Sequence, residues 1–255
     1  MQPRYFECDR TPLYAVVKEP SGEYIADFAV LMCYPFGDEY MRIHAAFRQL
    51  ANLLAHKGIV SMRFDYSGTG DSSGESSKFS LTTARQEIKT MVAELEEYTG
   101  VSEVRVIGFR LGAALAYESL SSVTAVKQIA CWDPIVSGKQ YLQEMREKVP
   151  PNQESECIVD DTWWINGYPV GNLLRTEIDD INMLEVDCHG FNKILHISSY
   201  DDEHVERLRN LCATEHRAFV FESIANQSSH KQTGAEDSLR YSTHTYKTLV
   251  DWLAD

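Results

Sequence analysis

Short continuous apolar runs that alternate with stretches of helical spacing constrain the fold of this chain most. After two short strands near the N-terminus, such runs are typical of strands covered on both faces of a sheet. We expect strands at Tyr5–Cys8, Leu13–Lys18, Phe28–Tyr34, Ile59–Phe64, Val104–Ile107, Val126–Trp132, Lys193–Ser198 and Ala218–Glu222. The helical spacing falls at Ile43–His56, Leu81–Tyr98, Ala113–Leu120, Glu203–Cys212 and Ser238–Leu253. This order predicts the α/β class, with a mostly parallel sheet flanked by helices.

Composition narrows the class of protein further. With 255 residues and 44% hydrophobic content, the chain can bury one large core. Its net charge of −14 makes nucleic acid and anionic membranes unfavourable partners. The six cysteines form no C-x-x-C pair, so we expect no metal site and no cofactor. Reduced thiols, no signal sequence and no apolar run of about 18 residues favour a cytoplasmic protein.

The segment 138–190 interrupts the alternation of strands and helices. It holds Pro150-Pro151, several acidic residues and Trp163-Trp164. An insertion at the carboxyl end of a strand in a doubly wound sheet lies over the ligand crevice. We therefore predict a core of residues 1–137 and 191–255, with 138–190 as a lid. A surface excursion with its own small core is the alternative.

One stretch combines a strand, a glycine turn and the start of a helix. Val104–Ala116 reads VRVIGFRLGAALA, and in many hydrolases this turn is G-x-S-x-G with the nucleophilic serine at its tip. Here Arg110 occupies the tip. A guanidinium stays protonated near neutral pH and cannot attack a carbonyl. A Ser–His–Asp acyl-enzyme mechanism is therefore excluded at this turn, which we call the elbow.

Further segments resemble the α/β-hydrolase superfamily in its serine-aminopeptidase-like branch. They are YPFGDE after the third strand, FDYSGTGDSSGE after the fourth, and the elbow itself. The sequence is most similar to exosortase A system-associated hydrolases, in which the elbow can read G-x-R-x-G; CWDPIVSGKQYL and INGYPVGNLL also resemble that group. The resemblance extends from about residue 29 to 253 and implies an α/β-hydrolase fold.

The resemblance also implies positions for a catalytic acid and base. The acid is expected at Asp201 in ILHISSYDDEHV, with Asp202 as a near alternative. Either could instead be a surface acid at the start of a helix, where carboxylates suit the dipole. The histidine is expected at His230, although loop histidines are usually surface residues; His244 falls inside a predicted helix and is expected to be solvated.

Two backbone N–H groups complete the expected site. Leu111 follows the elbow tip, and Phe36 lies in the loop after the third strand. Pro35 has no N–H and cannot donate. These donors depend on the backbone, so they can survive the loss of the serine.

Arg110 itself allows two interpretations. Its planar fork at a helix N-terminus can clamp a carboxylate or phosphate, or stabilise an oxyanion. Alternatively it forms a structural ion pair with Glu39, Asp133 or Asp201, all predicted near the carboxyl ends of the strands. The two can coexist if one carboxylate neutralises part of the charge.

These observations leave more than one function open. In the first interpretation, the chain is expected to act on or hold an acyl ester, thioester or amide in a biosynthetic pathway. A small acyl or anionic substrate and an acyl carrier protein are then its candidate partners. Water activated by His230 and Asp201 is the only hydrolytic route without a side-chain nucleophile. The alternative is an inactive pseudo-hydrolase that binds an anionic acyl ligand or a partner protein. A serine hydrolase with another elbow is disfavoured, because no second G-x-S-x-G occurs.

Overall fold

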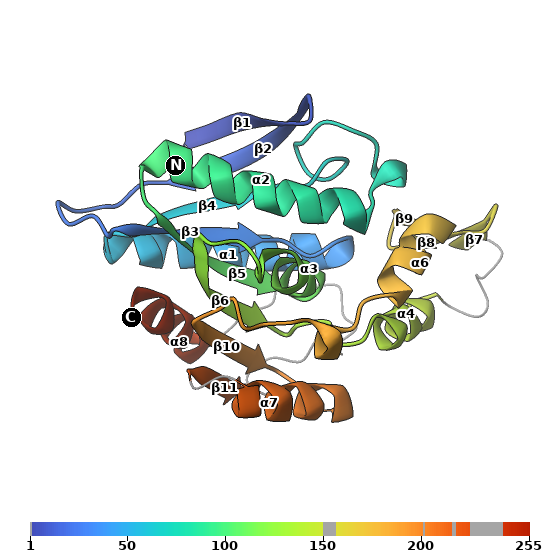
Figure 1. The fold of residues 1–255 in the computed structure, drawn as a ribbon. Coiled ribbons are helices and arrows are strands. Elements are labelled where there is room, and N and C mark those ends of the chain that lie inside the picture. The colour runs from blue at the N-terminus through green and yellow to red at the C-terminus, as the bar shows by residue number, and fades with distance from the viewer. Residues whose placement is uncertain (1, 150–156, 201, 216–217, 225–241) are drawn as a thin grey trace.

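A single eight-stranded sheet runs through the computed structural model, which describes residues 2–149, 157–200, 202–215, 218–224 and 242–255. Its strand order is β1-β2-β4-β3-β5-β6-β10-β11 (Figure 1). Strand β2 pairs antiparallel with β1 on one side and with β4 on the other, and all other neighbours are parallel. The bounds are β1 Gln2–Cys8, β2 Thr11–Lys18, β3 Phe28–Cys33, β4 Val60–Phe64, β5 Glu103–Phe109, β6 Val126–Trp132, β10 Lys193–Ser198 and β11 Phe219–Ser223.

Helices cover both faces of this sheet, as the parallel arrangement requires. Helices α1 and α8 lie together on one face, whereas α2, α3 and α7 lie on the other (Figure 1). Their bounds are α1 Asp38–His56, α2 Leu81–Thr99, α3 Leu111–Leu120, α7 Glu203–Glu215 and α8 Thr243–Ala254, with a short 3-10 turn η1 at Ser76–Lys78. The predicted α/β class, with a mostly parallel sheet flanked by helices, is therefore confirmed.

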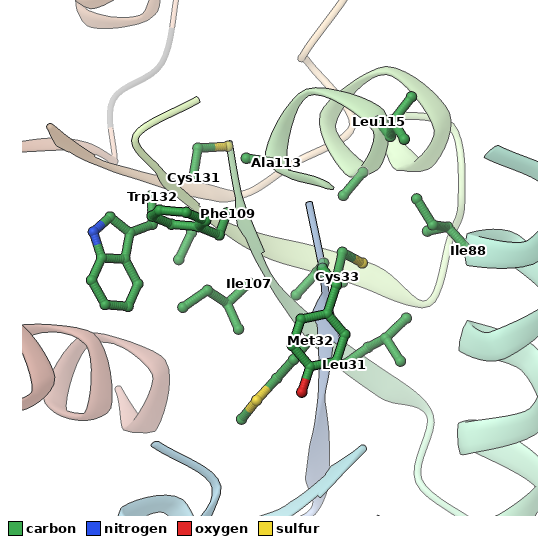
Figure 2. Close-up of a cluster of buried hydrophobic side chains, with 14 of the residues drawn as sticks. Leu31, Met32, Cys33, Ile88, Ile107, Phe109, Ala113, Leu115, Cys131 and Trp132 are labelled. Carbon is green, nitrogen blue, oxygen red and sulfur yellow. The ribbon is translucent and has the colours of Figure 1, made fainter. Parts of the chain in front are cut away.

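The central strands read as unbroken apolar runs because both of their faces are buried. Every residue of β3 is buried. Leu31 of β3 and Cys131 of β6 lie on one face of the sheet, whereas the cross-strand partners Met32 and Ile107 lie on the other (Figure 2). Ile88 of α2 and Leu115 of α3 close this core from one side.

The buried cysteines belong to the same core. Cys33 and Cys131 are fully buried, and burial raises the pKa of both thiols far above the ordinary value. A thiol that resists ionisation is a poor nucleophile. Cys33 therefore acts as a small apolar residue and does not replace the missing serine.

The segment between β6 and β10 forms separate elements at the carboxyl end of the sheet. A small antiparallel sheet, β7-β8-β9, is flanked by helices (Figure 1). The elements are α4 Gly138–Glu147, β7 Ile158–Val159, β8 Thr162–Ile165, β9 Tyr168–Val170, α6 Asn172–Asp179 and the 3-10 turn η3 Met183–Glu185. Glu177 of α6 accepts hydrogen bonds from Leu81 N (2.7 Å) and Thr82 N at the start of α2. The assignment of this segment as a lid stays a prediction.

The length and polarity of the helices bear on whether one of them could enter a bilayer. Within the described ranges, none is both long enough and apolar enough to cross a membrane.

Candidate functional site at the elbow

The backbone at Arg110 has the strained conformation of a strand-to-helix elbow. Its φ of 50° and ψ of −119° lie in a region that residues with a side chain rarely adopt. Arg110 N donates to Trp132 O at 2.9 Å, which ties the turn to β6. The strain fixes the side chain at the carboxyl end of the sheet, directly before α3.

The two glycines of G-x-R-x-G permit close backbone approaches on either side of the elbow. A Cβ at Gly108 would lie 2.4 Å from Ala113 Cα, and one at Gly112 would lie 2.3 Å from Tyr34 O. Both distances are too short for any side chain. The glycines are therefore explained by how closely α3 packs onto β5 and β3.

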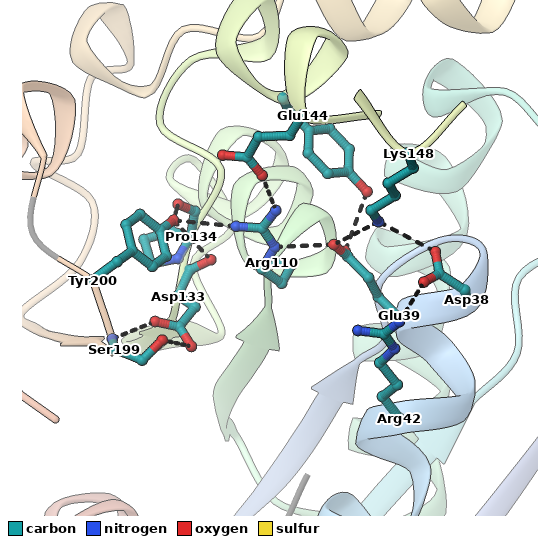
Figure 3. A network of polar contacts seen from close by, with 11 residues as sticks. Asp38, Glu39, Arg42, Arg110, Asp133, Pro134, Glu144, Lys148, Ser199 and Tyr200 are labelled. Atoms are coloured by element: carbon teal, nitrogen blue, oxygen red, sulfur yellow. Dashed lines mark hydrogen bonds and ion pairs between the residues drawn. The ribbon is translucent and has the colours of Figure 1, made fainter. Parts of the chain in front are cut away.

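The guanidinium of Arg110 is buried and bonded to three side chains (Figure 3). Its Nε donates to Glu39 Oε1 at 3.2 Å, and its Nη2 donates to Glu144 Oε2 at 2.6 Å. Its Nη1 donates to the Tyr200 hydroxyl at 3.3 Å. The Arg110 side chain is 5% exposed, the Glu39 side chain 10% and the Glu144 side chain 38%. The structure thus contains the ion pair with Glu39, which is one of the alternatives that the sequence leaves open for Arg110.

The carboxylate partners of Arg110 belong to a wider network of alternating charges. Tyr141 of α4 donates to Glu39 Oε2 at 3.2 Å. Lys148 Nζ lies 3.4 Å from Asp38 Oδ1 and 3.8 Å from Glu39 Oε1, and Arg42 pairs with Asp38 (Figure 3). The network ties the elbow, the start of α1 and α4 together, so the position of α4 depends on the charge at Arg110.

Two effects oppose a cation at this position. Burial disfavours the charged guanidinium, and the N-terminus of α3 carries a partial positive charge. Glu39, Tyr200 and Glu144 outweigh the burial and raise the pKa of Arg110 well above its ordinary value. Burial and then Glu39 likewise raise the pKa of Tyr141, which therefore remains a neutral donor. Arg110 can bind and orient an anion but cannot exchange a proton.

Asp133 is not a partner of Arg110, contrary to one alternative from the sequence. Its Oδ1 accepts from Ser199 N at 2.6 Å, and its Oδ2 accepts from Ser199 Oγ at 3.0 Å. Asp133 therefore fixes the end of β10. Tyr200, which follows that strand, donates to Pro134 O at 2.9 Å while it accepts from Arg110 (Figure 3).

The expected acid and base fall only partly within the described structure. Asp201 and His230 lie outside the described residues, so their roles stay predictions. Asp202 accepts from Val205 N at 2.9 Å and from Gln140 Nε2 at 3.0 Å, so it acts as the carboxylate at the start of α7. His244 is exposed on α8, where its Nε2 lies 2.9 Å from Glu222 Oε1, as expected of a solvated residue.

The two expected backbone donors come from different segments, the start of α3 and the loop after β3. Leu111 is the first residue of α3, where an N–H has no acceptor within its own helix. Phe36 is buried in the loop after β3, and its ring stacks on Phe79 with the centroids 4.5 Å apart. Their role as oxyanion donors stays a prediction.

Three members of the network could not be found from the sequence. Glu144 and Tyr141 lie in the insertion, and Tyr200 lies in the loop after β10. None forms part of a motif. The one indication of such partners in the sequence is Arg110 itself, because a buried arginine requires carboxylate partners.

The arrangement of strands, elbow and helices defines the α/β-hydrolase fold. Solved structures that share it include Est1E of Butyrivibrio proteoclasticus with ferulic acid bound (16% identity, 98% of this chain and 96% of that one, TM-score 0.66). Mouse alpha/beta hydrolase domain-containing protein 10 is 13% identical over 99% of this chain and 97% of its own, with TM-score 0.64. The Pyrococcus furiosus esterase PF2001 is 15% identical, covers 87% and 80%, and has TM-score 0.64. At these identities the likeness shows the fold alone.

Sequence comparisons add one partial match. An acyl transferase family model matches residues 36–142, less than half of the 255-residue chain. Comparison with curated proteins gives no match. The matched region begins at the expected oxyanion loop and includes the elbow, so the likeness covers part of the site that we describe.

Proposed function

We propose that this protein holds an anionic acyl ligand at the elbow and does not form a serine acyl-enzyme. The ligand class is an acyl ester, thioester or amide, and an acyl carrier protein is a candidate donor in a biosynthetic pathway. One observation carries the proposal: a permanently charged arginine stands in the strained position of the nucleophile. An arginine there favours binding of negative charge over attack on a carbonyl.

The two carboxylates around Arg110 have different roles in this proposal. Glu39 is buried and is also bonded by Tyr141, so it keeps the cation in place. Glu144 belongs to α4 and its side chain is 38% exposed. A ligand carboxylate takes the place of Glu144 at Nη2, with the acyl oxygen directed at the Leu111 and Phe36 N–H groups.

Binding of purified protein to monomethyl succinate and to the monothioester of succinate with N-acetylcysteamine tests this proposal by calorimetry. Arg110→Ala should abolish binding of both. Glu144→Gln should tighten binding several-fold, because it removes the competing carboxylate and leaves Arg110 charged. Glu147→Gln is the control, since Glu147 is an exposed residue of the same helix. Binding that survives Arg110→Ala contradicts the proposal.

The partial match to the acyl transferase model favours a second candidate, in which the protein turns its ligand over. Here water activated by His230 and Asp201 attacks the acyl carbon of a carrier-bound or free thioester, and the thiol leaves with a proton. Chromatography of the thioester after incubation distinguishes the two. Consumption that is lost in His230→Ala supports turnover, whereas an unchanged thioester supports binding alone. Labelling of the protein by a fluorophosphonate probe would contradict both.

A further inference from the structure

A pocket lies beside α1 and is separate from the elbow. Its volume is about 330 Å³, within the range of small-molecule sites. Helix α1 turns Glu39 toward Arg110. It presents another face to the pocket, on which Tyr40, His44 and Arg48 recur every four residues. We call the space between this face and the N-terminal strands the pocket beside α1.

The opposite wall of the pocket is one face of the sheet. Val16 and Arg63 are cross-strand partners in β2 and β4, so their side chains point the same way. Tyr14 and Asp65 continue this face two residues further along, and Asp65 N donates to Tyr14 O at 2.9 Å. A cation and a carboxylate therefore stand in line along this wall, with the carboxylate at the end where β4 leaves the sheet.

The negative end of the pocket is level with the first turn of α1. The Tyr40 hydroxyl donates to Asp65 Oδ1 at 2.8 Å, and Asp71 N donates to Asp65 Oδ2 at 2.9 Å. These bonds engage both oxygens of Asp65 and bring Asp71 to the same end of the pocket. Asp71 is exposed and makes no ion pair with any residue in the described ranges. Asp71 is therefore the carboxylate that is available to a ligand.

The positive end lies two turns further along the same helix. Arg48 follows Tyr40 by eight residues, or roughly 12 Å along the axis of α1. Because helical side chains all lean toward the N-terminus of their helix, the ends of the two side chains have a similar offset. Arg48 is exposed and pairs with no carboxylate in the described part of the chain. Arg63 on the opposite wall is buried, and its Nη1 donates to the Tyr34 hydroxyl at 3.2 Å.

Ring faces line the space between the two ends. Tyr34 and Tyr40 have ring centroids 4.7 Å apart, and the His44 ring lies at 10° to the Tyr34 ring with the centroids 6.0 Å apart. Burial and then Arg63 lower the pKa of His44, so its imidazole is neutral near pH 7 and adds no charge. The middle of the pocket therefore suits an apolar group, whereas its two ends suit charges of opposite sign.

We propose that this pocket binds a linear zwitterion, an ω-amino carboxylate whose two charges are at opposite ends of an apolar chain. The ligand carboxylate pairs with Arg48, its ammonium pairs with Asp71, and the chain between them packs on the rings of Tyr34 and Tyr40. Each ion pair takes up about 3 Å, so an offset of roughly 12 Å between the ends leaves about 6 Å between the ligand charges. An extended chain of about five bonds has this length.

The compound 5-aminopentanoate has this length and carries both charges. Three relatives each lack one of its features. Pentanoate lacks the ammonium, pentylamine lacks the carboxylate, and the isomer 2-aminopentanoate has the same atoms and charges but carries both charges on one carbon. NMR titration of the whole protein gives the four dissociation constants. We expect 5-aminopentanoate to bind about fivefold more tightly than each relative, as exposed ion pairs allow.

Each relative can overturn the proposal. Binding of pentanoate or of pentylamine as tight as that of 5-aminopentanoate would show that only one end of the pocket takes part. Equally tight binding of 2-aminopentanoate would show that the separation of the charges is not recognised. Absence of binding by 5-aminopentanoate would contradict the proposal as a whole.

Variants then assign the charges to residues. Arg48→Gln should weaken binding of 5-aminopentanoate about fivefold and leave that of pentylamine unchanged. Asp71→Asn should weaken binding of 5-aminopentanoate about fivefold and leave that of pentanoate unchanged. Arg207→Gln on α7 and Glu97→Gln on α2 remove exposed charges of the same two signs elsewhere and should change none of these values. Equal weakening in these two controls, or unchanged binding in Arg48→Gln or Asp71→Asn, contradicts the assignment.

Discussion

Helix α1 separates two regions that contain similar residues in opposite states. At the elbow, Arg110 is buried and its three bonded groups are all side chains of this protein. In the pocket beside α1, Arg48 and Asp71 are exposed and form no ion pair within the described ranges. Both regions contain arginines, carboxylates and tyrosines. They differ in whether the charges already have partners.

This difference shows which charges maintain the fold and which are available to a ligand. A buried cation without a partner is costly, so the residues around Arg110 must neutralise it in the folded state. An exposed charge is solvated and has no such requirement. Substitutions in the two regions should therefore change different quantities: stability at the elbow and ligand affinity in the pocket.

The largest effect is expected from Glu39→Ala. It leaves the buried Arg110 without its most enclosed partner and also removes the acceptor of the Tyr141 hydroxyl. Breaking a buried ion pair costs about 3–5 kcal/mol, and urea denaturation followed by circular dichroism measures the loss. Glu97→Ala, an exposed carboxylate of α2, is the control and should change the free energy of unfolding by less than about 0.5 kcal/mol. A loss below about 1 kcal/mol for Glu39→Ala would mean that the network does not stabilise the elbow.

A second prediction uses a buried group that remains neutral instead of finding a charged partner. His196 of β10 packs edge-on against Phe219, and burial lowers its pKa to about 3 from 6.5. Between these two values the unfolded chain takes up a proton that the folded chain does not, so stability is lost as the pH falls below 6.5. At pH 5 the free energy of unfolding is lowered by about 2 kcal/mol through this group.

Denaturation at pH 7 and pH 5 measures this loss. His196→Leu should remove about 2 kcal/mol of the difference between the two pH values, whatever its effect at pH 7. If both proteins lose the same free energy on acidification, other groups cause the acid sensitivity. Arg110 and His196 can then be compared directly. Arg110 is buried and keeps its charge because it has carboxylate partners, whereas His196 is buried and stays neutral.

The central fold could be read from the sequence because burial on both faces leaves a local signal. The run Phe28–Tyr34 and the elbow glycines predict β3 and the turn, and the structure confirms both. Helix α1 begins at Asp38, whereas the apolar spacing indicates Ile43. The first turn of α1 does not follow the apolar spacing, because it holds carboxylates that suit the helix dipole and belong to the elbow network.

The partners in both regions could be predicted only in part, because they depend on contacts between distant segments. Glu39 was predictable from its place after a central strand, but Glu144 depends on how the insertion packs over the elbow. In the pocket, Tyr40, His44 and Arg48 read as the solvated face of a helix. Their surroundings depend on how β1 pairs with β2 and β2 pairs with β4, and this pairing has no local signature in the sequence.

The next smaller effect is expected from Glu144→Gln, which tests the other partner of Arg110. Because the Glu144 side chain is 38% exposed, water compensates for much of the lost interaction. We expect a loss of about 1 kcal/mol in the free energy of unfolding, measured under the same conditions as Glu39→Ala. A loss as large as that of Glu39→Ala would show that the two carboxylates are equivalent, and that Glu144 cannot be exchanged for a ligand.

The smallest effect on stability is expected in the pocket beside α1. Arg48→Gln and Asp71→Asn each remove a solvated charge, so each should change the free energy of unfolding by less than about 0.5 kcal/mol. A large loss of stability in Arg48→Gln would place this arginine among the structural charges and remove the distinction between the two sides of α1.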